Sequence, residues 1–149
     1  MEVGFWFKSD LFKIGVGEGQ EATPGCYGRA LGHWLCDQFR KLGYDAKELI
    51  PEDWGWCVMC TRKPYMLWIG CGAVLPDEFY ENHAPDAQPA VEDIVWHVFP
   101  HIEVPFMYLK SWIKKSIGRL DIHQPLYELN SELKNILESE PRIELCDAP

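Results

Sequence analysis

Apolar residues alternate along the first segment of the chain and then recur at helical spacing. Val3, Phe5 and Phe7 fall on one side of an extended segment, which predicts a strand over residues 3–8. Thr23-Pro24 is a typical helix start and Gly43 a typical helix end. Between them, six large apolar residues recur at three- and four-residue spacing, typical of an amphipathic helix: Tyr27, Leu31, Trp34, Leu35, Phe39 and Leu42.

Two apolar runs, residues 54–60 and 65–71, predict a β-hairpin around Arg62-Lys63, with Gly55 opposite Gly70. One face is expected to carry Trp54, Trp56, Val58, Cys60, Tyr65, Leu67, Ile69 and Cys71. The other face is expected to carry Gly55, Cys57, Met59, Met66, Trp68 and Gly70. Because neither face is polar, the hairpin is either covered on both sides or has one side that serves as a binding surface.

The remaining pattern predicts a mixed fold with mostly consecutive strands. The expected elements are an extended segment at 46–50, a turn at 51–53, a long loop at 72–91, a strand at 94–99, helices at 106–117 and 124–140, and an edge strand at 142–146. We therefore expect one α+β domain over residues 1–149. Its mainly antiparallel sheet has about five or six strands, one long helix from the N-terminal half and two C-terminal helices packed on it.

Charge is unevenly distributed and narrows the choice of partners. The net charge of the 149 residues is −9, and no Lys or Arg occurs between Lys63 and Lys110. That interval contains seven acids: Asp77, Glu78, Glu81, Asp86, Glu92, Asp93 and Glu103. Such a field repels nucleic acid and anionic membrane surfaces, but it attracts a basic protein. The alternative is a charged surface that only keeps the protein soluble.

The six cysteines predict core packing, with no metal site and no cofactor. Cys57 and Cys60 have the spacing of a redox or zinc pair, but strand alternation sends their side chains to opposite faces. The amino-terminal residues lack the basic and apolar segments of a secretory signal, so we expect reduced thiols and a cytoplasmic location.

Catalytic chemistry is the third hypothesis for this chain. His97 lies in a strand and is a better general-base candidate than His83 or His101. Paired with Cys71, it could form a small hydrolase-like site, although no nucleophile motif surrounds either residue. The glycines of residues 15–19 lack the lysine of a phosphate-binding loop, so we reject that interpretation.

The segment Pro51–Trp56 is the most distinctive string of the sequence. Glu52 and Asp53 are expected in water, with Trp54 and Trp56 on one face of the strand. On the other face, Gly55 and Gly70 leave a groove beside Trp68, which either receives a helix or binds an aromatic or cationic ligand. The helix at 106–117 carries Lys110, Lys114 and Lys115, with Arg119 just after it, as its solvent side or as a basic docking face.

The run Leu-Ile-Pro-Glu-Asp-Trp-Gly-Trp at 49–56, followed by Leu-Trp-Ile-Gly-Cys-Gly at 67–72, resembles a family of small uncharacterised bacterial proteins. Similar small proteins are products of accessory genes, including mobile cassettes and toxin-immunity genes. The resemblance implies a bacterial cytosolic α+β domain and supplies no catalytic residue.

The leading hypothesis is a non-enzymatic interaction protein, immunity-like in its role, that binds a basic partner protein. The candidate binding residues are Glu52, Asp53, Trp54, Trp56, Trp68, Asp77, Glu78, Glu81 and His97. Reversing Asp77, Glu78 and Glu81 to lysine is expected to abolish capture of the partner. A small-molecule-binding domain with a Trp-lined pocket is the alternative, and the apolar hairpin makes a homodimer plausible.

Overall fold

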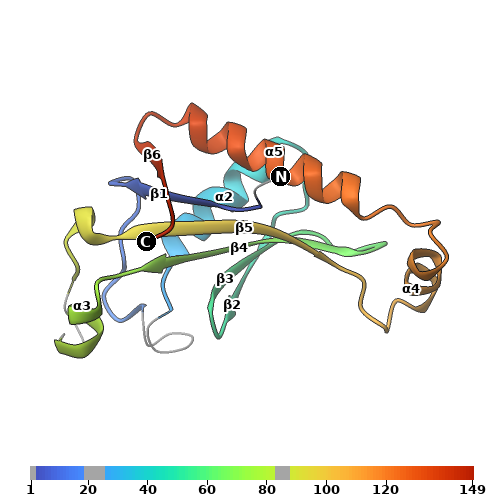
Figure 1. The fold of residues 1–149 in the computed structure, drawn as a ribbon, viewed down its shortest axis with the longest axis horizontal. Coiled ribbons are helices and arrows are strands. Elements are labelled where there is room, and N and C mark those ends of the chain that lie inside the picture. Colours follow the sequence, from blue (N-terminus) through green and yellow to red (C-terminus); the bar gives the residue numbers. More distant parts are fainter. Residues whose placement is uncertain (1–2, 19–25, 83–87) are drawn as a thin grey trace.

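A single six-stranded antiparallel sheet organises the molecule (Figure 1). The computed structural model describes residues 3–18, 26–82 and 88–149. The strands are β1 (Phe5–Ser9), β2 (Glu48–Glu52), β3 (Gly55–Thr61), β4 (Met66–Val74), β5 (Val95–Glu103) and β6 (Ile143–Cys146). The helices are α2 (Arg29–Lys41), α3 (Asp77–Asn82), α4 (Leu109–Ser116) and α5 (His123–Ser139), with a 3-10 turn η1 (Val91–Asp93). The predicted α+β class and antiparallel sheet are confirmed.

The sheet has the order β2-β3-β4-β5-β1-β6. Strands β2 to β5 follow one another as a meander, and β1 is inserted between β5 and the edge strand β6. The predicted edge strand near residues 142–146 is confirmed by its pairing with β1. Beside it, the Arg142 guanidinium contacts Asp10 at 2.8 Å, and the Ser9 hydroxyl donates to the Arg142 carbonyl at 2.6 Å.

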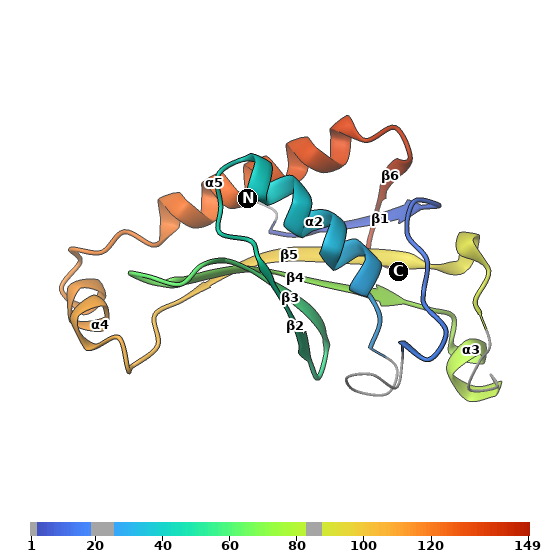
Figure 2. The same ribbon diagram turned by 180° about the vertical axis from the view of Figure 1, so that it is seen from behind.

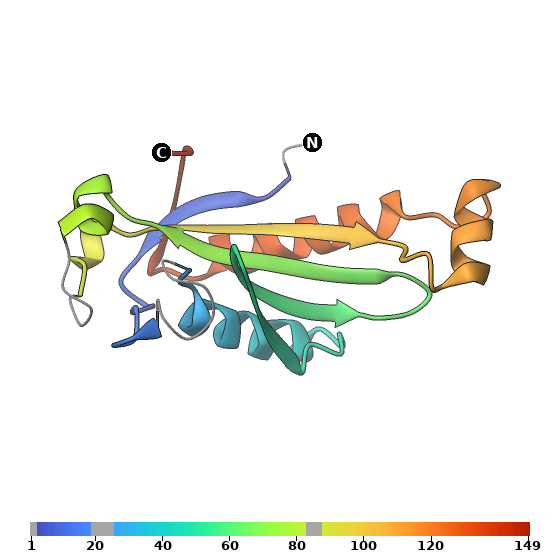
Figure 3. The same ribbon diagram turned by 90° about the horizontal axis from the view of Figure 1, so that it is seen from below.

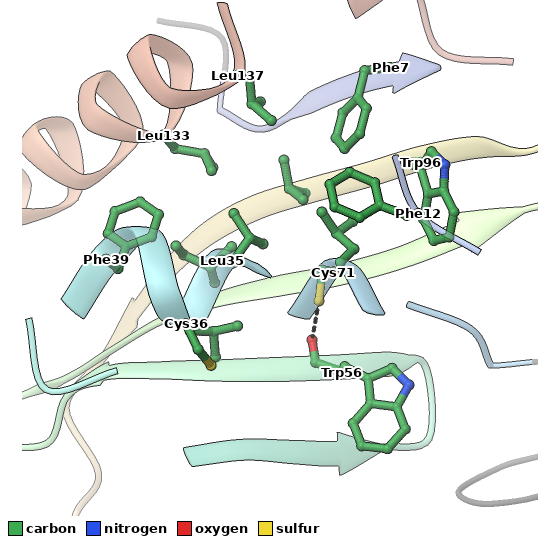
Figure 4. Packing of buried hydrophobic residues seen from close by; sticks show 14 of the residues in the cluster. Phe7, Phe12, Leu35, Cys36, Phe39, Trp56, Cys71, Trp96, Leu133 and Leu137 are labelled. Carbon is green, nitrogen blue, oxygen red and sulfur yellow. Dashed lines mark hydrogen bonds between the residues drawn. The ribbon is translucent and has the colours of Figure 1, made fainter. Parts of the chain in front are cut away.

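Helices α2 and α5 both pack on the same face of the sheet. Figure 2 shows α2 in front of the strands, and in Figure 3 both helices lie behind them. Each helix repeats apolar residues four apart, which places them on one side. Figure 4 shows the resulting core, whose buried members include Phe7, Leu35, Phe39, Trp96, Leu133 and Leu137. Gly32 lets α2 approach β2 closely, because a Cβ there would lie 2.5 Å from the Leu49 side chain.

Helix α2 begins later than predicted. Residues 26–28 are not helical, and Thr23-Pro24 lie outside the described residues. The reason is a buried carboxylate: Glu18 accepts hydrogen bonds from the backbone N–H groups of Gly28 and Arg29 at 2.8 and 2.7 Å. A third N–H, from Gly15, donates to its other oxygen at 2.8 Å. The helix N-terminus therefore already holds an anion supplied by the glycine-rich segment itself.

The hairpin of β3 and β4 forms, but its predicted register is wrong by two residues. Trp56 pairs with Cys71 and Cys57 with Gly70, so Gly55 does not face Gly70. The connection comprises residues 62–65 in place of a two-residue turn, and the pairing shifts between Met59 and Thr61. A two-residue shift keeps each strand side chain on its predicted face.

Two further expectations are corrected. Residues 72–91 do not form one long loop, because β4 runs to Val74 and α3 follows at once. Pro76 precedes α3, and Asp77 and Glu78 lie in its first turn, where acids stabilise a helix. Strand β5 also continues through Pro100, which is possible because the pairing of β1 with β5 reaches only to Val98.

Only one of the two C-terminal helices packs on the sheet. Leu129, Leu133 and Leu137 of α5 are fully buried, whereas none of the eight residues of α4 is buried. Figure 1 shows α4 beyond the ends of the strands. Among the described residues, no helix combines the length and the apolar character that crossing a bilayer requires.

Candidate functional site

The face of the sheet opposite the helices is the candidate site, and we call it the open face. Within the described residues, no helix packs on it, and Figure 3 shows it from the front. Its members follow from the strand pairing: Trp68 pairs with Met59 and with His101, and Gly70 pairs with Cys57 and with Phe99. His97, also on β5, pairs with Gly72 of β4 on one side and with Trp6 of β1 on the other.

Six aromatic and imidazole rings form a continuous row across the open face, which we call the aromatic row: Trp6, His97, Phe99, Trp54, Trp68 and His101. Trp6 stacks on His97 with ring centroids 3.8 Å apart, and His97 stacks on Phe99 at 5.2 Å. At the other end, the centroids of Trp68 and His101 lie 4.7 Å apart. The row thus spans β1, β5 and β4 without a break.

Trp54 covers the centre of this row from the turn between β2 and β3. Its ring stacks on Trp68 at 5.6 Å and contacts Phe99 at 5.5 Å. Trp54 is 41% exposed, so much of this large apolar side chain faces water. A folded protein rarely exposes a contiguous aromatic surface unless it binds something there.

Two glycines of β4 have different roles under the row. A Cβ on Gly70 would lie 2.4 Å from the Phe99 ring, so glycine allows this ring to lie across the strand. A Cβ on Gly72 would meet only backbone oxygens at 3.6 and 3.7 Å, which is ordinary contact. The Phe99 ring therefore occupies the space over Gly70 in which the sequence predicted a groove beside Trp68.

Acidic side chains border the row. Glu52 and Asp53 are exposed beside Trp54, and Glu103 is exposed at the far end of β5. Their charge acts on the open face: burial first, and then the charges of Glu52 and Glu103, together raise the pKa of the Cys57 thiol to about 12. Burial lowers the pKa of His97, which favours a neutral imidazole between its two aromatic neighbours.

The structure brings three of the predicted binding residues into the aromatic row: Trp54, Trp68 and His97. Glu52 is close enough for its charge to act on Cys57 of the open face, and Asp53 is exposed next to Trp54 in the chain. Trp56 is not with them, although it was expected on the same face as Trp54. Trp56 lies in strand β3 and belongs to the buried core. Trp54 precedes the strand, so the alternation of β3 does not determine its direction, and its ring folds over the opposite face.

The acids of α3 extend the negative charge beyond the row. Asp77, Glu78 and Glu81 are exposed and lie just past the end of β4. Figure 3 shows α3 outside the strands, at the end opposite α4. These acids can attract a cation at long range without contributing to the aromatic contact.

The chemistry expected from Cys71 and His97 is not assembled. Cys71 is completely buried in the core, where its thiol contacts the carbonyl of Trp56 at 3.4 Å (Figure 4). His97 lies on the open face, so the sheet separates the two groups. Burial also raises the pKa of the Cys71 thiol well above its usual range, which opposes thiolate formation.

The cysteine pair is likewise divided between the two faces. Cys60 belongs to the buried core, whereas Cys57 pairs with Gly70 on the open face. In the part of the chain that the structure describes, no cluster of three or more His, Cys, Asp or Glu residues could hold a metal ion. His83 lies outside the described residues.

Sequence reasoning did not include Trp6, Phe99 and His101 in the site. A signal for two of them was present, because alternation along β5 places His97, Phe99 and His101 on one side. The signal for Trp6 was its position between Phe5 and Phe7, which directs it away from the core. What the sequence does not contain is the order β5-β1, which sets Trp6 beside His97.

Comparisons with known proteins do not assign this chain to a family. No family model, curated protein or solved structure matches the chain. The function is therefore inferred from the chemistry of the open face.

Proposed function

We propose that this protein is a non-enzymatic interaction protein that binds a basic segment of a partner protein on its open face. The observation that carries the proposal is the aromatic row, exposed at Trp54 and bordered by Glu52, Asp53 and Glu103. The partner we propose is rich in arginine or lysine.

Aromatic faces and carboxylates together select cations. The face of an indole ring attracts guanidinium and ammonium groups, and the attraction strengthens where water is partly excluded. Arginine also stacks flat on aromatic rings while its N–H groups reach neighbouring carboxylates. Trp54 and Trp68 offer the rings, and Glu52 and Asp53 lie next to Trp54.

The surrounding charge favours the same class of partner. Residues 64–109 contain no Lys or Arg, so β4 and β5 carry no cation that would repel a basic segment. The acids of α3 add long-range attraction at one end of the sheet. An immunity-like role, in which the open face covers a basic surface of a toxin, is the specific form that the sequence resemblance implies.

A fluorescence titration with a polyarginine peptide tests the proposal. The peptide is expected to quench tryptophan emission saturably, and Trp54→Ala with Trp68→Ala is expected to weaken binding by about tenfold or more. Arginine methyl ester, added alone, separates a small-cation site from a protein surface: saturable quenching by it at similar concentration would favour the small-molecule alternative.

A charge-matched pair of variants supplies the control. Glu52→Gln with Asp53→Asn removes two charges at the row, and Asp37→Asn with Glu138→Gln removes two charges from helices α2 and α5. We expect the first pair to weaken peptide binding severalfold more than the second. Equal effects would show that only net charge matters, and the open face would not be the docking site.

A further inference from the structure

Helix α4 and the residues that flank it present more large apolar side chains to water than any other segment that the structure describes. Phe106 is 71% exposed and Met107 is 83% exposed, just before the helix. On the helix and after it, Leu109, Trp112, Ile113 and Ile117 are all more than 40% exposed. Trp112 has Phe106 against it, edge to face at 5.4 Å. An amphipathic helix normally buries such a side against its own domain.

The same segment is basic. Residues 104–120 carry Lys110, Lys114, Lys115 and Arg119 and no acid, whereas the whole chain has a net charge of −9. The chain therefore contains one segment with the chemistry that its own open face selects: exposed cations beside exposed apolar side chains. This complementarity of charge identifies the open face as the kind of surface that binds α4.

The two complementary surfaces lie at opposite ends of the sheet. Glu103, which leads to α4, pairs with Met66 at the start of β4. Glu52 pairs with Gly55 at the start of β3, which lies at the end of the sheet where β4 ends. In Figure 3, α4 lies beyond the strands at one end and α3 at the other. Because α5, which follows α4, is fixed on the opposite face, α4 is held at the other end of the sheet from Glu52 and Asp53 of its own chain.

We propose that α4 docks on the acidic end of the open face of a second copy of this chain. In this arrangement the open faces of the two copies face each other. A two-fold axis lies between the two sheets and runs across the strands, so the α4 end of each copy lies over the Glu52–Trp54 end of the other. Both copies then make the same contact, so the assembly closes as a two-fold dimer. The inference rests on the proposed function, because it uses the cation selectivity of the open face.

Sedimentation equilibrium with complementary charge reversals tests the dimer. The wild-type chain is expected at twice its 17.3 kDa mass. The helix variant (Lys110→Glu, Lys114→Glu, Lys115→Glu) and the face variant (Glu52→Lys, Asp53→Lys) should each be monomeric, because each sets like charges against each other. An equimolar mixture should recover the dimer, since both of its contacts then pair opposite charges.

Two further variants control this experiment. Lys13→Glu, Lys41→Glu and Lys134→Glu make the same change in net charge outside α4 and are expected to leave the dimer intact. Trp112→Ala is expected to weaken the dimer by about tenfold or more, because the apolar side of α4 also enters the contact. Circular dichroism of each variant confirms that it is folded.

The outcomes separate this proposal from the proposed function. A wild-type monomer, a dimer that survives both charge reversals, or a mass that grows without limit would overturn the two-fold dimer. If the wild-type chain is monomeric and binds phosphatidylserine vesicles through α4, the occupant is a lipid surface and the proposal is wrong. The helix variant keeps its open face, so its titration with polyarginine decides the proposed function independently.

Discussion

Gly70 and Gly72 lie on the same side of β4, but only Gly70 requires the absence of a side chain. We expect Gly70→Ala to lower the free energy of unfolding by about 1–3 kcal/mol, because the new methyl group displaces the Phe99 ring. Gly72→Ala is expected to be tolerated, since its Cβ meets only ordinary contacts. Urea denaturation measures both.

A double variant decides whether Phe99 is the cause. In the Phe99→Ala background, the space over Gly70 is vacated, and Gly70→Ala should then cost far less. An unchanged cost in that background would contradict the role assigned to Phe99.

His97 is expected to make stability depend on pH. Burial holds its pKa in the folded protein below the ordinary value of about 6.5, so the unfolded chain binds the proton more readily. The contribution of neutral His97 to the free energy of unfolding is therefore fully present above about pH 6.5, and it is lost as the pH falls through the folded-state pKa. We expect His97→Gln to flatten the decline in the free energy of unfolding below pH 6.5.

An NMR titration of the His97 imidazole measures the same property directly. A midpoint at or above the ordinary histidine value would contradict the effect of burial between Trp6 and Phe99. Because the protonated ring places a positive charge in the aromatic row, polyarginine binding should also weaken as this group titrates.

At the residue scale, sequence periodicity separated the faces of β3 and β4 but could not place a side chain in a turn. Val58, Cys60 and Ile69 are buried in the core as alternation requires. Trp54 differs because it lies one residue before β3, where the backbone turns. Its direction depends on the rings of Trp68 and Phe99, which are brought to it by pairing between strands.

At the scale of elements, the contact between Glu18 and the N-terminus of α2 is the most consequential local device. The Glu18 carboxylate is 2% exposed and accepts three backbone N–H groups. We expect Glu18→Ala to lower stability by about 3 kcal/mol, or roughly 10 °C in Tm, because buried donors lose a charged acceptor. Differential scanning calorimetry measures the change.

The matched control is Glu138→Ala on α5. This exposed carboxylate lies 3.7 Å from the Lys134 ammonium, and a surface ion pair of this kind contributes about 0.5 kcal/mol. Equal losses in the two variants would show that the carboxylate of Glu18 has no special role at the helix start.

The existence of most elements follows from local patterns, whereas their limits depend on tertiary contacts. The spacing of Leu31, Leu35 and Phe39 is sufficient to predict α2, but its start is determined by Glu18, ten residues before Gly28. The amphipathic pattern of α4 predicted a helix correctly. The same pattern implied packing on the sheet, which does not occur because the helix lies beyond the strand ends.

At the scale of the whole molecule, charge governs how the open face meets a partner. Since the attraction is electrostatic and near the surface, polyarginine binding is expected to weaken as salt is raised. Glu52→Gln with Asp53→Asn should reduce the slope of log Kd against log salt, whereas the control pair on α2 and α5 should leave the slope nearly unchanged. Isothermal titration at several salt concentrations measures these slopes.

Affinity that is independent of salt would contradict an electrostatic contact at Glu52 and Asp53. The sequence already indicated an acidic protein with a basic partner. It could not locate the surface, because the aromatic row draws on β1, β4, β5 and the β2–β3 turn, which are far apart along the chain.

The insertion of β1 between β5 and β6 has a consequence for synthesis on the ribosome. β1 is synthesised before the other strands of the sheet. Phe5 can pair only after Val98 has been synthesised, and Phe7 can pair with Leu145 only later still. The meander of β2 to β5 can assemble during translation, but β1 cannot close the sheet on both sides until β6 has left the exit tunnel. Closure of the sheet around β1 therefore depends on β6, and the nascent chain carries an unpaired strand until β6 is available.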